Sequence, residues 1–435
     1  MMIDLHKLAA MLQQLDDQMV TCMKCGMCQA VCPVFRETLR EADVTRGKIA
    51  LLENLAHEMI ADAKGVQEKL NKCLLCGSCQ ANCPSGVAIM DIFLKARIIV
   101  NSYLGLPAAK KVIFKAMLTK PRLFNALVAM GEKFQGLLAS PADDLLGSSC
   151  SKIMSPLIGD RHFLPLAETS FHKIVPKLDT PAGRSGLKVA FFPGCVIDKM
   201  LPRVGEAVLK VLRHHGVGVY LPPAQACCGI PAVSSGDSES FGKLVRLNVK
   251  AFAKGQFDHL VTACATCTAT IKEIWPKFMD DYSPDMQVKI RQLVDKTMDI
   301  NQFLVDRVGV QSQPAPTGGT RVTYHDPCHL KKSLGVSDQP RTLLKANPAY
   351  NFVEMSEADQ CCGNGGTFNI QHYDVSRRIG DRKRDNILAS NAEVVAAGCP
   401  ACMMQLTDML SQHGDRIRVC HPVEIYAQTL IGGSR

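Results

Sequence analysis

Two cysteine runs in the first hundred residues constrain this chain more than any other feature. Residues 22–33 read CMKCGMCQAVCP, and residues 73–84 read CLLCGSCQANCP. Both follow the pattern Cys-x2-Cys-x2-Cys-x3-Cys-Pro, which holds two [4Fe–4S] clusters with the fourth Cys of each run serving the other cluster. Three thiolates on one tight loop can reach three irons of a cube, and the fourth iron needs a ligand from elsewhere. The spacing therefore predicts two cubane clusters.

This crossed arrangement assigns four ligands to each cluster. One predicted set is Cys22, Cys25, Cys28 and Cys83. The other predicted set is Cys73, Cys76, Cys79 and Cys32. A pair of zinc sites is the alternative, because zinc also binds thiolates. Zinc sites need only four ligands each and rarely show this doubled run with Pro, so the spacing favours clusters.

The insert between the two runs has helical periodicity. Its apolar residues on one broad face are Ile49, Leu51, Leu52, Leu55, Met59 and Ile60. Over about residues 15–100, the two runs with a helical insert resemble the helical ferredoxin domain in the iron–sulfur subunits of succinate dehydrogenase and related enzymes. The resemblance implies an all-α ferredoxin domain over residues 1–100.

Five further cysteines recur in the same order in the second half of the chain. The first copy contains Cys195, Cys227, Cys228, Cys264 and Cys267. The second copy contains Cys328, Cys361, Cys362, Cys399 and Cys402. Each copy starts with a β-rich run that ends at Cys, continues with Cys-Cys-Gly and ends with Cys-x2-Cys. The two copies are offset by 133 to 135 residues, and such a constant offset indicates a duplicated domain.

Strand-length apolar runs alternate with helical stretches around these cysteines. Runs such as VAFFP, GVGVYL and HLVTAC in the first copy, and VTYH, NFVEM and EVVAAG in the second, are typical of strands. Alternating strands and helices predict an α/β fold with parallel strands and with sites at the strand C-terminal ends. We therefore expect a basic helical connector over residues 101–185, a first cysteine-rich domain over 186–315 and a second over 316–435.

These motifs resemble the cysteine-rich CCG domains of heterodisulfide reductase and of the iron–sulfur subunits of glycolate oxidase and lactate-utilisation enzymes. The order of motifs is similar to that of the glycolate oxidase iron–sulfur subunit and of the heterodisulfide reductase subunit fused to a ferredoxin domain. The anaerobic glycerol-3-phosphate dehydrogenase membrane-anchor subunit shares this order. The resemblance implies one or two further clusters, non-cubane [4Fe–4S] in type, held by the five-cysteine sets. A zinc ion, or a plain cubane with one thiolate to spare, is the alternative.

Two of the 20 cysteines, Cys150 and Cys420, belong to no set and are interpreted as buried inert thiols. The N-terminal sequence lacks the features of a secretory signal, and a cytosolic chain keeps its thiols reduced, so metal is favoured over disulfides. His325 and His329 flank Cys328 and are expected to bond backbone or sulfide rather than iron. His421 is expected to start the last helix.

The net charge of +9 is concentrated in one segment, in which Glu132 is the only acid. Its basic residues are Lys95, Arg97, Lys110, Lys111, Lys115, Lys120, Arg122 and Lys133. The segment is either a solvated helical surface or a docking face for an acidic partner or an anionic membrane. Nucleic-acid binding is not expected, because no recognition motif accompanies the charge and only 6% of residues are aromatic.

No apolar stretch of transmembrane length is present, so we expect no transmembrane helix. The expected location is the cytoplasm, with peripheral attachment to the inner face of the cytoplasmic membrane as an alternative. No dinucleotide fingerprint or phosphate loop is present either, so the chain is not expected to bind flavin or NAD. The sequence identifies no catalytic residue.

The resemblance implies an electron-transfer subunit of a flavin-dependent lactate or glycolate (2-hydroxyacid) dehydrogenase complex. Its partner would be a flavin-containing dehydrogenase subunit, and its acceptor a quinone or another carrier. Two alternatives stay open. One is a heterodisulfide reductase-type catalytic subunit that reduces a disulfide. The other is a membrane-docked, quinone-reducing subunit of the glycerol-3-phosphate dehydrogenase type.

Overall fold

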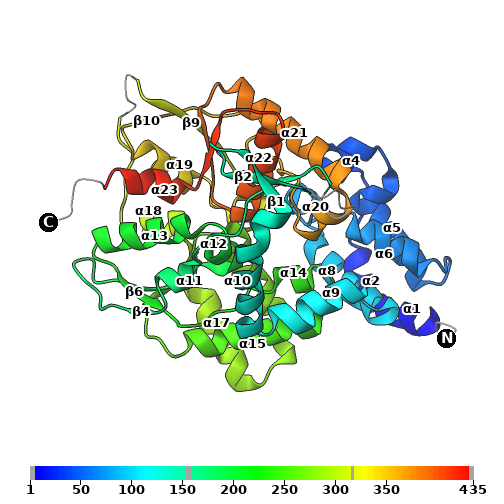
Figure 1. The fold of residues 1–435 in the computed structure, drawn as a ribbon. Coiled ribbons are helices and arrows are strands. Elements are labelled where there is room, and N and C mark those ends of the chain that lie inside the picture. The colour runs from blue at the N-terminus through cyan, green and yellow to red at the C-terminus, as the bar shows by residue number, and fades with distance from the viewer. Residues whose placement is uncertain (1–4, 153–158, 315–317, 431–435) are drawn as a thin grey trace. The chain divides into compact units, whose positions relative to one another are not determined.

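The structure, a computed structural model, describes residues 5–152, 159–314 and 318–430 (Figure 1). The chain forms two compact units. The first unit contains residues up to Thr119 together with Gly229–Gly242 and Gly363–Ile379. The second unit contains Lys120–Cys228, Lys243–Cys362 and the chain from Gly380 onward. The expected boundary at residues 315 and 316 lies outside the described residues.

The first unit is helical. Its elements are α1 (Leu5–Gln13), α2 (Asp16–Met19), α3 (Met27–Val31), α4 (Pro33–Thr38), η1 (Glu41–Asp43), α5 (Thr45–Ala56), α6 (Ala63–Asn71), α7 (Ser78–Ala81), α8 (Ile89–Leu104), α9 (Ala108–Lys111), η2 (Val112–Leu118), α14 (Ile230–Val233) and α20 (Thr367–Gln371). Helix α1 packs on α5 and α8, and α6 also packs on both of these helices. Leu8, Leu52, Val66 and Phe93 are buried in this core. The expected helical ferredoxin region is confirmed.

Helix α5 carries most of the apolar face expected for the insert. Ile49, Leu52 and Leu55 are fully buried. The helix is shorter than the pattern suggested, because it ends at Ala56, just before a left-handed turn at residue 58 with φ 56°. Met59 follows that turn and is 75% exposed, so its assignment to the buried face was wrong.

The second unit contains two mainly parallel sheets. The strands of the first are β4 (Leu178–Asp179), β5 (Lys188–Phe192), β6 (Gly218–Leu221), β7 (His259–Thr262) and β8 (Thr297–Asp299), in the order β4-β6-β5-β7-β8. The strands of the second are β9 (Thr320–His325), β10 (Tyr350–Phe352), β11 (Val394–Ala397) and β12 (Arg418–Cys420), in the order β10-β9-β11-β12. All pairs are parallel except β4 with β6. The order β6-β5-β7-β8 thus repeats as β10-β9-β11-β12, which confirms the α/β fold of both copies.

Helices connect and cover these strands. They are α12 (Gly194–Lys199), α13 (Pro202–His214), α16 (Ala265–Ala269), η3 (Thr270–Ile274), η4 (Trp275–Asp281), α17 (Pro284–Lys296), α18 (Ile300–Asp306), η5 (His329–Ser333), α19 (Asp338–Lys345), α22 (Pro400–Gln412) and α23 (Pro422–Gln428). Helices α15 (Ser238–Phe252) and α21 (Tyr373–Ala389) begin in the first unit. One core cluster of the second copy contains Val322, Tyr324, Leu344, Val394 and Ile425. Apolar faces of strands and helices therefore hold the second copy together.

The stretch expected as a helical connector is helical only in its first part. Helix α10 (Pro121–Leu138) is followed by a small antiparallel sheet of β1 (Ala139–Asp143), β2 (Ser148–Ser151) and β3 (His162–Phe163), and then by α11 (Phe171–Ile174). Arg97, counted in the basic segment, is buried rather than solvated. Across residues 5–152, 159–314 and 318–430, no helix has the length and apolar character needed to cross a membrane.

Candidate metal centres

The cysteines of the two N-terminal runs line two cavities in the first unit. The first cavity has an empty volume of about 360 Å³. Its lining thiols are Cys22, Cys25, Cys28, Cys83 and Cys79. The second cavity has an empty volume of about 420 Å³. Its lining thiols are Cys32, Cys73, Cys76 and Cys79. Cys83 thus lies with the cysteines of the first run, and Cys32 lies with those of the second.

Both runs fold into the same type of loop. Gly26 (φ 87°) precedes α3, and Gly77 (φ 72°) precedes α7, each in the left-handed region. Lys24 (φ 55°) and Leu75 (φ 53°) hold the same conformation two residues earlier, where a side chain makes it unfavourable. Local strain of this kind is retained where a site requires the backbone to turn sharply. In each run, the turn directs three thiols toward one cavity.

Burial makes these thiols poor acids in the absence of metal. It raises the pKa of Cys32 to about 12 and raises the pKa of Cys28 as well, because a thiolate is costly to desolvate. Thiolates buried at such a site are compensated when a metal binds them. Four thiols around a small cavity therefore fit a thiolate-bound metal centre.

The first five-cysteine set lies at the C-terminal edge of the sheet formed by β5, β6 and β7. Cys195 is the second residue of α12, just after β5, and Cys264 precedes α16, just after β7. The Sγ atoms of Cys195 and Cys227 are 3.9 Å apart. Contacts with Cys228 and Cys264 raise the pKa of the buried Cys267 thiol. These contacts join all five cysteines into one group.

Polar side chains hold the Cys-Cys-Gly loop of this set. Asn248 accepts the N–H of Ala226 at 2.8 Å and donates to the carbonyl of Cys227 at 2.9 Å. The indole N–H of the buried Trp275 donates to the carbonyl of Cys228 at 2.9 Å. The loop is therefore fixed by main-chain contacts that leave the thiols available for metal.

The second set has the same local arrangement. Cys328 precedes η5 after β9, and Cys399 precedes α22 after β11. Contacts with Cys362 and Cys399 raise the pKa of the buried Cys402 thiol. Cys361 lies next to Cys362 in the chain, and both are buried. Both cysteine sets thus lie at the strand ends, where open α/β sheets place their sites.

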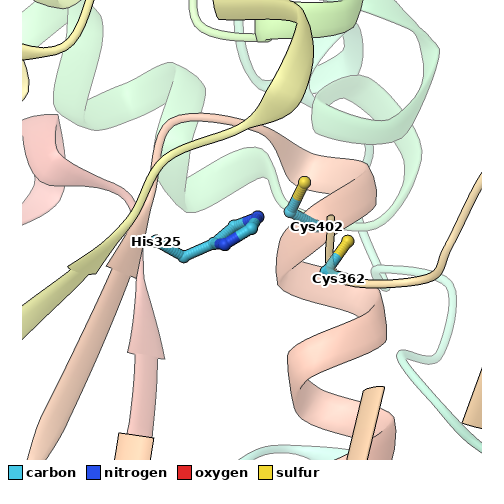
Figure 2. A group of neighbouring side chains, drawn as sticks. All are labelled: His325, Cys362 and Cys402. Carbon is cyan, nitrogen blue, oxygen red and sulfur yellow. The ribbon is translucent and has the colours of Figure 1, made fainter. Parts of the chain in front are cut away.

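His325 belongs to this second site. Figure 2 shows its ring at the end of β9, pointing toward Cys362 and toward Cys402 on α22. The potential ligand atoms of these three residues lie within 4.8 Å of one another. Burial lowers the pKa of His325 to about 3, so the ring is neutral. Neither ring nitrogen has a hydrogen-bond partner among the described residues, so the expected bond to backbone is absent and the ring faces sulfur.

The two sets meet at Cys264 and Cys399. The neighbouring Cys264 thiol, together with Cys402 and Thr266, lowers the pKa of the buried Cys399 thiol. The N–H of Ala265 donates to the carbonyl of Gly398 at 3.0 Å. The repeat therefore brings its two cysteine sets side by side, which sequence spacing alone did not indicate.

Four other residues of interest lie nearby. Nδ1 of His329 lies 3.2 Å from Oγ1 of Thr266, a side-chain partner rather than the expected backbone or sulfide. His421 caps α23 and shares a capping box with Glu424, as expected for the start of the last helix. Cys420 is buried, as expected, but Cys150 is only half-buried and lies 3.4 Å from the hydroxyl of Ser140.

Comparison with known proteins gives the same order of parts. Residues 18–87 match the 4Fe-4S dicluster domain family, which indicates two clusters. Residues 189–272 and 322–407 each match the Cysteine-rich domain family.

Three relatives share this organisation. The Bacillus subtilis protein named "Probable glycolate oxidase iron-sulfur subunit" is 29% identical over 94% of both chains. One of the subunits of the Methanothermobacter marburgensis "Fumarate reductase (CoM/CoB)" is 29% identical over 90% of this chain and 68% of its own. The Oceanobacillus iheyensis protein named "Lactate utilization protein A" is 34% identical over 57% of this chain and 99% of its own. The chain therefore belongs to the family of iron–sulfur proteins with cysteine-rich domains that includes lactate utilization protein A.

Proposed function

We propose that the chain is the electron-transfer subunit of a flavin-dependent lactate or glycolate (2-hydroxyacid) dehydrogenase complex. It carries electrons from a flavin-containing partner subunit to a quinone or another carrier. The observation that carries this proposal is the placement of two four-thiol groups and two five-thiol groups in one chain without a dinucleotide or phosphate-binding motif.

In this proposal, each N-terminal cavity holds one cubane cluster. The ligands of the first are Cys22, Cys25, Cys28 and Cys83. The ligands of the second are Cys32, Cys73, Cys76 and Cys79. When bound, such clusters accept and release single electrons. Cys79 lines both cavities, and its position in the second run assigns it to the second cluster.

The five-cysteine sets are proposed to hold one or two further clusters. Five thiols exceed the tetrahedral requirement of zinc, and their mutual contacts support one polynuclear centre in each set. His325 is the one non-cysteine side chain that joins a possible ligand group among the described residues. The organic substrate is oxidised on the partner, because hydride transfer requires a cofactor such as flavin.

Anaerobic purification followed by iron, sulfide and zinc analysis tests the ligand assignment. We expect roughly sixteen irons for each chain if all four sites hold four-iron clusters. Stoichiometric zinc with little iron would overturn the proposal. Mixing the loaded chain with a purified flavin-containing lactate dehydrogenase subunit tests the role. Lactate-dependent reduction of a soluble quinone should require both proteins, and equal rates without the chain would contradict the assigned role.

Heterodisulfide reductase-type catalysis is the second candidate, and the contact between the two sets at Cys264 and Cys399 favours it. Two adjacent redox centres could each supply one electron to the sulfur–sulfur bond of a small disulfide. The test supplies dithionite and a low-molecular-weight disulfide without any partner. Thiol release that depends on Cys399 would favour this candidate, whereas no release would leave the electron-transfer role.

Docking to a membrane is a third candidate, supported by α10, in which Arg122 and Lys133 accompany the exposed side chains of Met130, Phe134 and Leu137. Flotation with vesicles containing anionic lipid tests it. No binding at physiological salt would exclude this candidate.

A further inference from the structure

Two buried cations lie at the second N-terminal cavity. Lys48 on α5 lines this cavity and is 2% exposed. Arg97 on α8 is 4% exposed and donates to the carbonyl of Cys73 at 2.9 Å, which attaches it to the loop of the second run. Both positive charges are therefore held next to the thiols of one proposed cluster.

These two cations have only main-chain hydrogen-bond partners among the described residues. Lys48 donates to the carbonyl of Asp43. Arg97 donates to the carbonyls of Leu70, Cys73 and Ser234, and its Nε atom has no partner there. A buried charge is costly unless an opposite charge compensates it. No carboxylate in the described part of the chain forms an ion pair with either residue.

The one buried carboxylate of this cavity is already neutralised. Asp43 is 1% exposed, and its oxygens lie 3.0 Å from Nζ of Lys72 and 3.7 Å from Nζ of Lys69. The surroundings therefore keep an excess of positive charge. Burial lowers the pKa of Lys48, and the neighbouring Cys73 and Cys32 sulfurs counteract this effect.

The first cavity is different. Its two cations, Lys24 and Arg46, are partly exposed and pair with carboxylates. Nζ of Lys24 lies 2.7 Å from Glu53, and Nε of Arg46 lies 2.5 Å from Glu41. Solvent and these carboxylates screen their charge. The two cavities thus have similar thiols and different electrostatic surroundings.

We infer that Lys48 and Arg97 are built-in countercharges that favour the reduced form of the cluster proposed for Cys32, Cys73, Cys76 and Cys79. The inference rests on the proposed function, because it requires a cluster there. One-electron reduction adds one negative charge to the site, with dithionite as the electron donor in the test below. Cluster potentials depend on nearby charge and burial, and unscreened cations oppose the effect of burial.

The test is a redox titration of the full chain, purified anaerobically and followed by electron paramagnetic resonance, in the presence of dithionite and mediators. In Lys48→Met, we expect the ratio of reduced to oxidised cluster at a fixed ambient potential to fall by about tenfold for one of the two cubane signals, about 59 mV for a one-electron couple. In the matched control Lys24→Met, the ratio should change by less than about twofold, because that charge is exposed and paired.

A conservative pair keeps the test decisive if Lys48→Met loses iron. Lys48→Arg keeps the positive charge, and Lys48→Gln keeps a hydrogen-bond donor without charge. We expect Lys48→Arg to retain the wild-type ratio and Lys48→Gln to lower it. Equal behaviour of these two variants, or an unchanged ratio in a fully loaded Lys48→Met, would overturn the inference. Failure of the proposed function would be seen separately, as a wild-type chain without cubane signals.

Discussion

The hydroxyl oxygen of Thr266 lies 3.3 Å from the Sγ atom of Cys399, although the two residues belong to different copies of the repeated cysteine pattern. The same hydroxyl lies 3.2 Å from Nδ1 of His329. A thiolate can only accept a hydrogen bond, so Thr266 donates to Cys399 when that sulfur is deprotonated. One side chain of the first copy thereby stabilises negative charge in the second.

Loss of this hydroxyl should make the second site harder to reduce. A hydrogen bond to a charged group contributes about 1.5 kcal/mol, which corresponds to roughly tenfold in an equilibrium. In Thr266→Val, we expect the ratio of reduced to oxidised second centre at a fixed potential to fall by about that factor, as measured by redox titration. Thr266→Ser keeps the hydroxyl and should resemble the wild type. An identical change in both variants would show that the hydroxyl is not the cause.

Pairs of cysteine substitutions should reveal which thiols share a cluster. Cys22→Ser should remove about four irons, and adding Cys83→Ser should remove few more, because both cysteines line the first cavity. Adding Cys32→Ser instead should remove about eight irons in total, because Cys32 lines the second cavity. Iron analysis with sulfide determination measures the difference. If Cys83 and Cys32 behaved the other way round, the crossed assignment would be wrong. Cys150→Ser is the control and should keep all iron.

Asp299 should make stability depend on pH. Burial raises the pKa of this carboxyl to about 7, whereas in an unfolded chain it is about 3.9. Between these values the folded state binds the proton more tightly, so the free energy of unfolding falls as pH rises from about 4 to 7. Asp299→Asn cannot ionise and should be more stable than the wild type by about 2 kcal/mol at pH 8, with a smaller gain at pH 5.

Urea denaturation at both pH values measures this difference. Asp285 lies on α17 with a 75% exposed side chain paired with Lys289, so Asp285→Asn is the matched control and should keep the wild-type dependence. The prediction fails if the Asp299→Asn and Asp285→Asn variants show the same change in stability between pH 5 and pH 8.

Gly194 should tolerate no side chain. Its φ is 76°, and an added Cβ would lie 3.1 Å from Sγ of Cys267. Gly194→Ala should lower the free energy of unfolding by about 1–2 kcal/mol from the backbone conformation and should reduce iron at the first five-cysteine set. Gly186 has a similar φ of 69° with open space around it, so Gly186→Ala should show the loss of stability without the loss of iron.

Sequence spacing predicted the parts of the sites that lie close together in the chain. The thiols of each N-terminal run sit on one short loop, so their grouping follows from local geometry. The strand ends that carry Cys195 and Cys328 were visible because the preceding runs are apolar and β-rich. Strands β8 and β12 have only three residues each, which is too short to produce a recognisable period.

The remaining features depend on packing between distant segments. Lys48 and Arg97 reach the second cavity only because α5 and α8 belong to one helical core, and a lysine within a helix looks like a surface residue in sequence. Thr266 contacts Cys399 because the two copies of the repeat lie side by side. His325 was noticed only as a neighbour of Cys328, and its approach to Cys362 and Cys402 depends on the arrangement of β9 and α22.

The chain contains a single tryptophan, and its indole is hydrogen-bonded to the carbonyl of Cys228. All tryptophan fluorescence of the purified chain therefore originates beside the first five-cysteine set. Iron–sulfur clusters absorb across the wavelengths at which indole emits, so assembly of that centre should quench Trp275 while filling of more distant sites has less effect. The native sequence thus provides an optical reporter for loading of one centre, without any added label.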